Sequence, residues 1–184
     1  MSLRHAFTAT AAALLLAAPA SAQQRAGLMA DLTRDVTELE TKLMGLAKAI
    51  PADKQSWRPG AGVRSVGEVW LHVTADNYLL PAALGVAPDP ETGIKATDYA
   101  TVQAYEARSM TRDQAVAALE KSFAHLKKAM AETPDARLDS TVKFFGQDRT
   151  VRQVWIATTT HLHEHLGQAI AYARSNGVVP PWSR

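Results

Sequence analysis

The most regular hydrophobic pattern lies near the start of the chain, over residues 25–49. Apolar side chains recur there at steps of three and four residues: Leu28, Leu32, Val36, Leu39, Leu43, Leu46 and Ile50. This spacing places them on one face of an α-helix, where they can pack against a core. Pro51 follows the last of them and cannot continue the helix. The pattern therefore predicts a long amphipathic helix over residues 25–49.

Capping-box motifs predict the starts of three further helices. In this motif a Ser or Thr side chain and a Glu or Gln three residues later bond each other's backbone amides. The motif occurs at Ser65–Glu68, Thr111–Gln114 and Thr150–Gln153, and a proline or glycine follows each segment, at Pro81, Pro134 and Gly177. These signals predict helices over residues 65–80, 111–132 and 150–176.

The capped segments carry apolar stripes of their own. We expect their core faces to include Val66, Val69, Val73 and Leu80 in one, and Val116, Leu119, Phe123, Leu126 and Met130 in the next. Trp70 and Trp155 are also interpreted as core residues. His125 lies off its helix's apolar stripe, so we expect its ring to be solvated.

The segments between the helices complete the fold prediction. Residues 82–110 form a long connection, with a short helical piece expected around residues 102–107, and such a connection usually crosses over or covers something. Residues 138–147 are β-prone and predict a loop or small ribbon, and Trp182 is expected to pack the tail against the helices. Because no part of the sequence predicts a convincing sheet, the pattern indicates an all-α four-helix bundle with a long crossover connection between helices 2 and 3.

The first 22 residues have the pattern of a secretory signal rather than of a fold. Arg4 and His5 precede an apolar run, and Ala20, Ser21 and Ala22 form a small-residue cleavage site. The run is too short to span a membrane. We therefore divide the chain into a signal peptide, residues 1–22, and one domain, residues 23–184, and expect a periplasmic or secreted protein cut after Ala22.

Composition narrows the functions that this domain can have. Removing residues 1–22 takes away one basic residue, Arg4, so 19 Lys and Arg remain against 18 Asp and Glu. A net charge of +1 without a basic block gives no case for nucleic acid or an anionic membrane. The chain has no cysteine, which excludes disulfides, thiolate nucleophiles and thiolate metal ligands. Any metal site must therefore use histidine and oxygen.

The helix predicted over residues 150–176 carries the most distinctive chemistry. Its sequence includes His161-Leu-His-Glu-His165. A spacing of four residues corresponds to about 40° of rotation and about 6 Å of rise, so His161 and His165 point the same way. Two imidazoles held like this supply half of a transition-metal site. Gln168 and Tyr172 fall on the same stripe, whereas His163 should face elsewhere.

A third histidine is a candidate partner for this pair. His72 lies on the helix predicted over residues 65–80, with Glu68 four residues before it and Asp76 four residues after it. Carboxylates at these positions can orient a metal-ligating imidazole. The same spacing also occurs in surface charge clusters, and both interpretations remain open for His72.

Taken together, these motifs make the chain resemble the DinB/YfiT superfamily of four-helix-bundle metalloproteins. The resemblance covers most of residues 23–184. It rests on Trp57-Arg58-Pro59, Ser65-Val66-Gly67-Glu68 with His72, Phe145-Gly146, and His161-x-x-x-His165-x-Gly167-Gln168-x-x-x-Tyr172-x-Arg174-x-x-Gly177-x-x-Pro180-Pro181.

The resemblance implies a DinB-like bundle with a three-histidine metal site. In that family one histidine of the second helix and a His-x-x-x-His pair of the fourth bind a divalent metal, usually zinc or nickel. These positions correspond to His72, His161 and His165. Characterised members transfer a low-molecular-weight thiol to an electrophile. Those thiols are cytoplasmic, so the export signal is a departure from that pattern.

Three functional hypotheses follow from the sequence. The first is a metal-dependent enzyme, a thiol transferase or hydrolase, whose metal activates a water or thiol of a small-molecule substrate. The second is a non-catalytic metal-binding or stress-related module of the cell envelope, and the third is a helical interaction protein without metal. Glu68 and Glu164 are weak candidates for a catalytic base or for the support of a ligand, and the interpretation of both as helix-surface or capping carboxylates is favoured. A homodimer is one assembly that the sequence allows.

Overall fold

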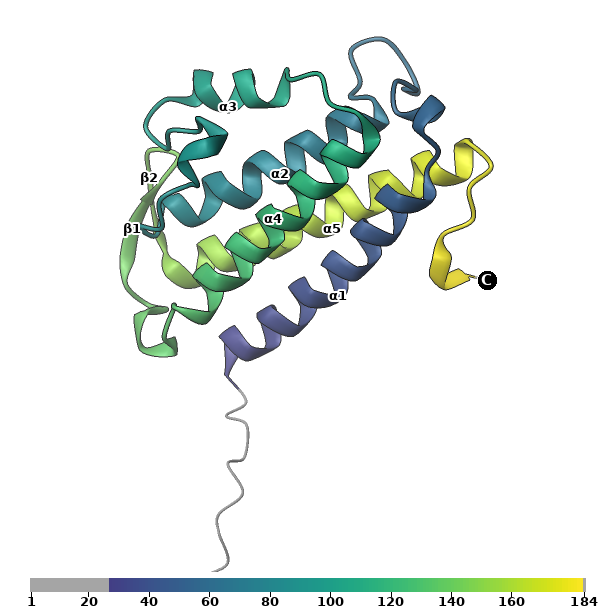
Figure 1. Ribbon diagram of the computed structural model, residues 1–184. Helices are drawn as coiled ribbons and strands as arrows, with labels where there is room; N and C mark the ends of the chain where they lie inside the picture. Colours follow the sequence, from purple (N-terminus) through teal and green to yellow (C-terminus); the bar gives the residue numbers. More distant parts are fainter. Residues whose placement is uncertain (1–26, 184) are drawn as a thin grey trace, which may run out of the picture.

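Four long helices form the body of the protein in the computed structural model, which describes residues 27–183 (Figure 1). They are α1 (Leu28–Ala49), α2 (Val66–Ala82), α4 (Arg112–Ala131) and α5 (Val151–Ser175). Their positions confirm the four predicted helices to within a few residues at each end. The signal peptide expected at residues 1–22 lies outside the described residues.

The four helices pack as a ring of neighbours. α1 and α2 each pack against both α4 and α5, so every helix buries its apolar stripe between two others. The largest buried side chains come from all four helices and include Trp70, Trp155, Phe123, Leu39 and Leu126. The two tryptophans are 1% and 0% exposed, as expected for core residues. The architecture is an all-α helical bundle.

The capping boxes form as predicted and fix where three of the helices begin. The side chains of Ser65, Thr111 and Thr150 each accept a hydrogen bond from the backbone three residues on, and the return bond is also present. α5 ends before Gly177, whose φ of 73° is the left-handed conformation typical of a helix terminus. α2 runs two residues further than predicted, because Pro81 is accommodated in its last turn.

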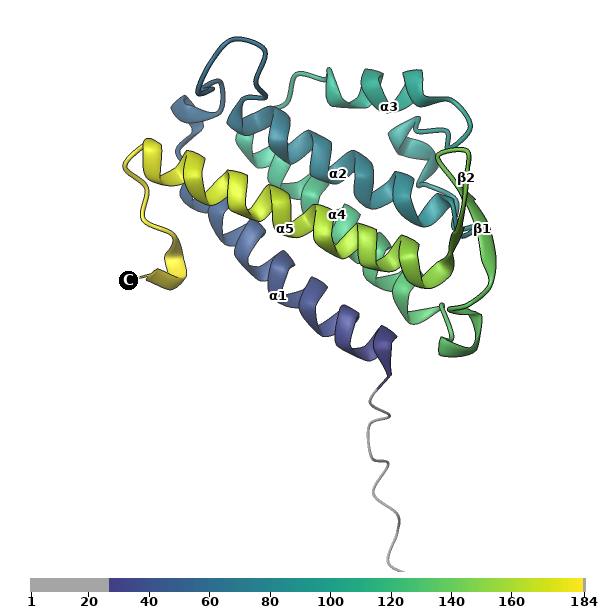
Figure 2. The same cartoon turned by 180° about the vertical axis from the view of Figure 1, so that it is seen from behind.

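The long connection between α2 and α4 crosses the outside of the bundle. It contains a 3₁₀ turn, Pro90–Thr92, and the short helix α3 (Tyr99–Glu106), which confirms the predicted helical piece and begins three residues earlier. α3 packs against α2. Figure 2 shows α2 and α5 side by side, with α3 running along α2. This arrangement brings the end of α3 close to the predicted histidine residues.

A two-stranded antiparallel hairpin joins α4 to α5. Strands β1 (Thr141–Phe144) and β2 (Gln147–Thr150) pair with Phe144 opposite Gln147, so the predicted ribbon is present and extends up to α5. The turn residues Phe145 and Gly146 have φ angles of 47° and 77°. Two consecutive positive φ angles are the signature of the type I′ turns that suit hairpins.

Short 3₁₀ turns fill the remaining connections. They span Ala52–Lys54, Asp135–Arg137 and Pro181–Ser183. The last of these packs against α1, and the side chains of Pro181 and Trp182 are the nearest neighbours of Gly45 there. Trp182 therefore does pack the tail against the bundle, although 42% of its surface stays exposed.

The prediction that the ring of His125 is solvated is wrong. Its ring lies against Tyr78 of α2, with ring centroids 4.8 Å apart. Its Nε2 atom is buried and has no hydrogen-bond partner within residues 27–183. Burial lowers the pKa of this imidazole from its ordinary value. The apolar stripe of α4 is wide enough to include His125 because α2 and the crossover cover that side of α4.

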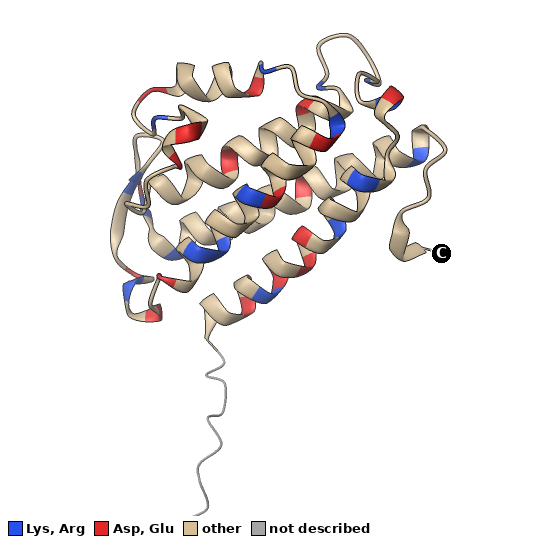
Figure 3. Ribbon diagram, in the orientation of Figure 1, with Lys and Arg blue, Asp and Glu red and all other residues tan. Residues whose placement is uncertain are grey.

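Charged residues of both signs are interspersed along the helices (Figure 3). Helix α1, for example, carries both basic and acidic residues along its length. No helix within residues 27–183 combines the length and apolar character needed to cross a membrane.

Candidate metal centre

Three imidazoles meet where α2 and α5 lie side by side. The Nε2 atoms of His161 and His165 are 3.0 Å apart, and Nε2 of His161 is 3.2 Å from Nε2 of His72. The pair on α5 is brought together by its four-residue spacing. His72 is 89 residues away in the sequence and reaches the pair only because α2 packs against α5. The three histidines that the sequence singled out are thus in mutual contact.

His72 is held in one orientation by the crossover. Its Nδ1 atom is 2.7 Å from Oε1 of Glu106, the last residue of α3, and Arg64 bonds the other oxygen of the same carboxylate at 3.0 Å. Burial opposes ionisation of Glu106, but the hydrogen bonds from His72 and Arg64 outweigh it and keep its pKa below the usual value. Because an ionised carboxylate only accepts, Nδ1 of His72 carries a proton, and in the neutral imidazole Nε2 then presents a lone pair.

His165 is oriented by a second chain of contacts. Its Nδ1 atom is 2.8 Å from Oε1 of Gln168, whose amide donates to the hydroxyl of Tyr172 at 3.0 Å. That hydroxyl in turn donates to the backbone carbonyl of Arg64 at 3.0 Å. Gln168 and Tyr172, predicted on the histidine stripe, are therefore its supports. Arg64 belongs to both chains of contacts, through its side chain for His72 and its backbone for His165.

His165 is a neutral imidazole across most of the pH range. Burial lowers its pKa, the hydrogen bond to Gln168 acts in the opposite direction, and the neighbouring His161 and His72 lower it again, to about 4. With Nδ1 donating to Gln168, its Nε2 presents a lone pair. Neutral imidazole with a free ring nitrogen is the form that binds metals.

His161 contacts both of the other rings and differs from them. Its Nδ1 atom is buried without a hydrogen-bond partner among the described residues. Its Nε2 atom faces Nε2 of both neighbours, and also Oδ2 of Asp76 at 3.0 Å. The same Asp76 oxygen is 3.5 Å from Nε2 of His72. The point at which the three rings meet is therefore also approached by a carboxylate.

The donor set at this point fits a divalent metal ion. Nε2 of His72, Nε2 of His165 and the Asp76 carboxylate are all acceptors, and Nε2 of His161 can supply a proton to only one of them. A cation between the three imidazoles, whose ring nitrogens lie within 4.8 Å of one another, would satisfy their lone pairs at once, and the Asp76 carboxylate approaches two of these imidazoles. Nitrogens that bind one ion at 2.0–2.1 Å lie about 3.0–3.4 Å apart, depending on whether the site is octahedral or tetrahedral, and the two measured separations are 3.0 and 3.2 Å.

The remaining residues singled out from the sequence lie away from this point. Glu68 completes the capping box by accepting from the backbone of Ser65 at 2.7 Å, and it pairs with Arg58 at 2.9 Å. The capping alternative is therefore the one adopted. Glu164 is exposed on α5. His163 faces away, as predicted, and its Nε2 contacts Asp35 of α1 at 2.9 Å.

Residues 35–169 match the family model of the DinB superfamily. The match covers most of the described chain and includes all three histidines. The chain belongs to the DinB superfamily. No curated protein matches it.

Solved structures agree with this membership at the level of the fold. A DinB-like protein from Bacillus cereus superposes with a TM-score of 0.67 at 16% identity, over 82% of this chain and 93% of that one. A DinB-like protein from Bacillus subtilis gives 0.63 at 17% identity, over 81% and 93%. A conserved protein from Enterococcus faecalis gives 0.66 at 12% identity, over 80% and 96%.

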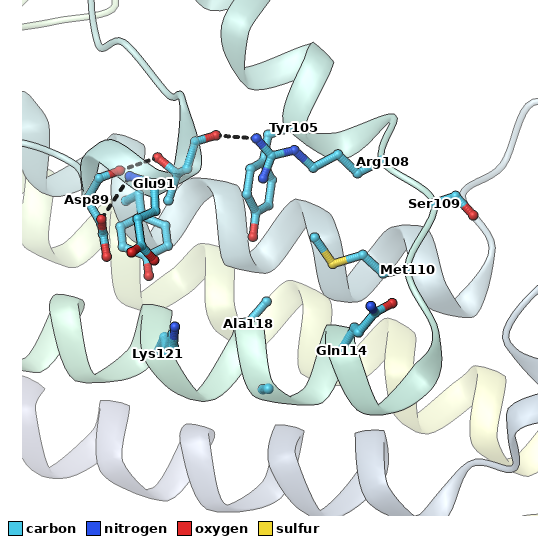
Figure 4. Close-up of a pocket in the computed structure, with 12 residues that line it drawn as sticks. Asp89, Glu91, Tyr105, Arg108, Ser109, Met110, Gln114, Ala118 and Lys121 are labelled. Atoms are coloured by element: carbon cyan, nitrogen blue, oxygen red, sulfur yellow. Dashed lines mark hydrogen bonds between the residues drawn. The ribbon is translucent and has the colours of Figure 1, made fainter.

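This DinB-superfamily chain also has a sizeable cavity between the crossover and α4, apart from the three histidines. It has a volume of about 540 Å³ and is lined by the connection, by α4 and by Tyr78 of α2. Figure 4 shows Tyr105 pointing into it from α3, with Asp89 and Glu91 at one end and Met110 and Gln114 at the other. None of its lining residues belongs to the histidine cluster. The connection was expected to cross over or cover something; it lines this cavity, and its Glu106 reaches the histidines.

Two members of the site were missed by sequence reasoning. Glu106 lies in the connection, 34 residues after His72, and Arg64 lies just before the capping box of α2. Neither belongs to a periodic pattern or to a motif that places a side chain. The only available signal was the length of the connection, which indicates that it covers something without saying which residue makes the contact.

Proposed function

We propose that this DinB-superfamily chain binds a divalent metal through His72, His161 and His165 and is a metal-dependent enzyme of the transferase or hydrolase type. The observation that supports this proposal most is the meeting of three Nε2 atoms, two of which are fixed with their lone pairs inward by hydrogen bonds from Nδ1. A plain polar core would pair these nitrogens with donors. Here they are directed at one another.

The donor atoms favour zinc or nickel as the ion. Neutral imidazole suits zinc, nickel, copper and iron better than it suits magnesium or calcium, which prefer oxygen ligands. The lack of cysteine removes the thiolate donors that closed structural zinc sites often use. The pKa of His165, about 4, means that its imidazole is neutral at neutral pH, with no proton on Nε2.

The chain's own residues orient the donors and admit a substrate. Glu106 and Gln168 hold two of the rings through their Nδ1 atoms, which is the usual support of a metal-ligating histidine. The side chain of His161 remains 22% exposed, so the site can be reached from solvent at this ring. A bound divalent ion supplies Lewis-acid chemistry and favours the deprotonated form of a water or thiol. Any thiol must be a substrate, since the chain contains no cysteine.

Metal content tests the first half of the proposal. Protein purified without a histidine tag should contain about one divalent ion per chain, and His161→Ala should lose most of it. His163→Ala is the matched control, because this histidine lies on the same helix and contacts Asp35 instead. Equal metal content in the wild type and in His161→Ala would refute the site.

Turnover tests the second half. Metal-loaded and chelated protein should be compared on a panel of thiols with electrophiles, and on esters and amides. We expect turnover that needs metal and is lost in His165→Ala. If metal-loaded protein turns over nothing on the panel, and added thiols leave the spectrum of a cobalt-substituted site unchanged, the non-catalytic envelope module replaces the enzyme.

Export is a separate part of the proposal. Residues 1–22 have the basic start, apolar run and small-residue cleavage site of a secretory signal. Mass spectrometry of the native protein should find Gln23 as the first residue. A protein that retains Met1 and stays in the cytoplasm would contradict this proposal and leave the metal site untouched.

A further inference from the structure

Asp76 lies four residues after His72 on α2, just as His165 lies four residues after His161 on α5. Both pairs are four residues apart on one helix, so each presents two side chains in the same direction, one turn apart. α2 and α5 lie side by side (Figure 2), and the two pairs contact each other between these helices. Three imidazoles and one carboxylate are therefore presented from two neighbouring helices toward one region.

The Asp76 carboxylate meets the face of the imidazoles that would hold the metal. Its Oδ2 lies 3.0 Å from Nε2 of His161 and 3.5 Å from Nε2 of His72. These separations bracket the spacing of about 3.0–3.4 Å expected between two donors on one ion. Glu106, in contrast, contacts the opposite nitrogen of His72, Nδ1. Two carboxylates thus touch the same histidine from its two sides.

Asp76 also lacks the partner that Glu106 has. Glu106 is paired with Arg64, whereas the ion pairs of Asp76 within residues 27–183 are with His72 and His161 alone. In the neutral imidazole whose Nδ1 bonds Glu106, Nε2 of His72 has no proton to donate to Asp76. The Asp76 side chain is only 13% exposed. A buried carboxylate needs a cation or several donors to remain charged, and a metal ion at the meeting point would be that cation.

We infer that Asp76 is a fourth protein ligand of the metal, completing a site of three nitrogens and one oxygen. This inference rests on the proposed three-histidine site and goes beyond it. A fourth protein ligand changes what the site can do. It fills a tetrahedral zinc site, which then resembles a closed structural one. An octahedral nickel site still keeps two open positions for a substrate.

Competition with a chelator, using cobalt and zinc as the probe metals, tests the inference. Asp76→Ala should weaken binding by more than about 100-fold and change the visible spectrum of the cobalt protein, because a ligand is lost. Glu106→Gln is the matched control: it keeps an oxygen that accepts from Nδ1 of His72, so it should weaken binding by about tenfold, the lower end of the range for outer supports of a metal ligand. Its cobalt spectrum should keep the wild-type shape.

A crystal structure of the metal-loaded wild type gives a second readout that depends on no variant. A carboxylate oxygen of Asp76 should lie about 2.0–2.2 Å from the ion. Asp76→Asn, which has nearly the same shape, should keep the fold if Asp76→Ala does not.

The outcomes separate this inference from the proposed function. A wild type without affinity for metal overturns both. Metal held by the three histidines, with Asp76 more than about 3 Å from the ion and Asp76→Asn binding as the wild type does, overturns the fourth ligand alone. Weakened binding together with a short metal–oxygen distance supports it.

Discussion

At the scale of single residues, the histidine cluster is defined by which nitrogen of each ring holds the proton. Glu106 and Gln168 fix this for His72 and His165. His161 has no such support, and its Nδ1 is buried without a partner among the described residues. A buried polar atom without a partner costs free energy. His161 therefore gains most from an ion that fixes its tautomer, which makes it the most informative histidine to substitute.

A first prediction concerns the hairpin turn. Phe145 has a φ of 47° and is 66% exposed, and a left-handed conformation costs a residue with a Cβ atom about 1–2 kcal/mol. Asn tolerates this conformation and is favoured in type I′ turns. Phe145→Asn should therefore raise the free energy of unfolding by about 1 kcal/mol, measured by urea denaturation. Gly146→Ala, at a φ of 77°, should have the opposite effect. A loss of stability in Phe145→Asn would show that the aromatic ring contributes more than the strain costs.

A second prediction concerns pH and His125. Burial lowers the pKa of His125 below its unfolded value, and Lys128 acts in the same direction, against Asp89 and Glu132. The folded state then binds fewer protons than the unfolded state, so stability is lost as pH falls below about 6.5 and through the folded pKa. His125→Phe keeps a ring against Tyr78 and removes the proton. Between pH 7.5 and 5.5 its unfolding free energy should fall less than that of the wild type. Equal losses would contradict the prediction.

The sequence predicted those site residues whose positions depend on local geometry. The His161–His165 pair follows from helical spacing alone, and so does the opposite orientation of His163. Glu68 could not be assigned in this way, because it is both one turn before His72 and third in a capping box, and only the folded chain shows that it caps. Glu106 could not be predicted from the sequence, because no periodicity relates the end of a crossover to a histidine on another helix.

At the scale of elements, the boundaries of the helices are set by their caps. The three capping boxes that the sequence contains all form, which is why the predicted starts of α2, α4 and α5 agree with the structure. α1 has Gly27 at its N-cap without a side-chain hydrogen bond, and its start was predicted three residues too early. Packing rather than local chemistry decides where such a helix begins.

A third prediction concerns the cap of the histidine helix. The Thr150 hydroxyl accepts from the backbone of Gln153, so Thr150→Ala should cost about 1 kcal/mol of unfolding free energy. Thr160→Ala is the control, because its exposed hydroxyl bonds backbone carbonyls within α5 and its loss should be nearly neutral. Urea denaturation measures both. A larger loss in Thr160→Ala would contradict the assignment of the cap.

At the scale of the whole molecule, the site depends on how the elements pack. α2 supplies His72 and Asp76, α5 supplies His161 and His165, and α3 supplies Glu106. Arg64, just before α2, contacts the supports of both His72 and His165. The bundle class was predictable from periodic stripes, whereas this convergence needs the pairing of α2 with α5 and the path of the crossover. Both are properties of packing that no single segment specifies.

A fourth prediction follows for metal binding and thermal stability. An ion that binds the folded state alone, at 1,000 times its dissociation constant, adds about 4 kcal/mol. For a domain of this size that corresponds to a rise in Tm of about 8–16 °C. Calorimetry with and without zinc or nickel measures the shift, and His72→Ala should remove most of it. An unchanged Tm in wild-type protein shown to be loaded would mean that the ion also binds the unfolded chain.

The contact between His72 and His161 closes a loop of 89 residues. An ion held by both would join helices that are distant in the sequence, and it would stabilise the chain by binding the folded state. A disulfide across a loop of about 100 residues is worth about 4–5 kcal/mol for a different reason, because it persists in the unfolded chain and restricts it. The chain has no cysteine with which to form one. A metal cross-link would differ from a disulfide in that a chelator can open it, so the stability of this bundle would follow the concentration of free metal around it.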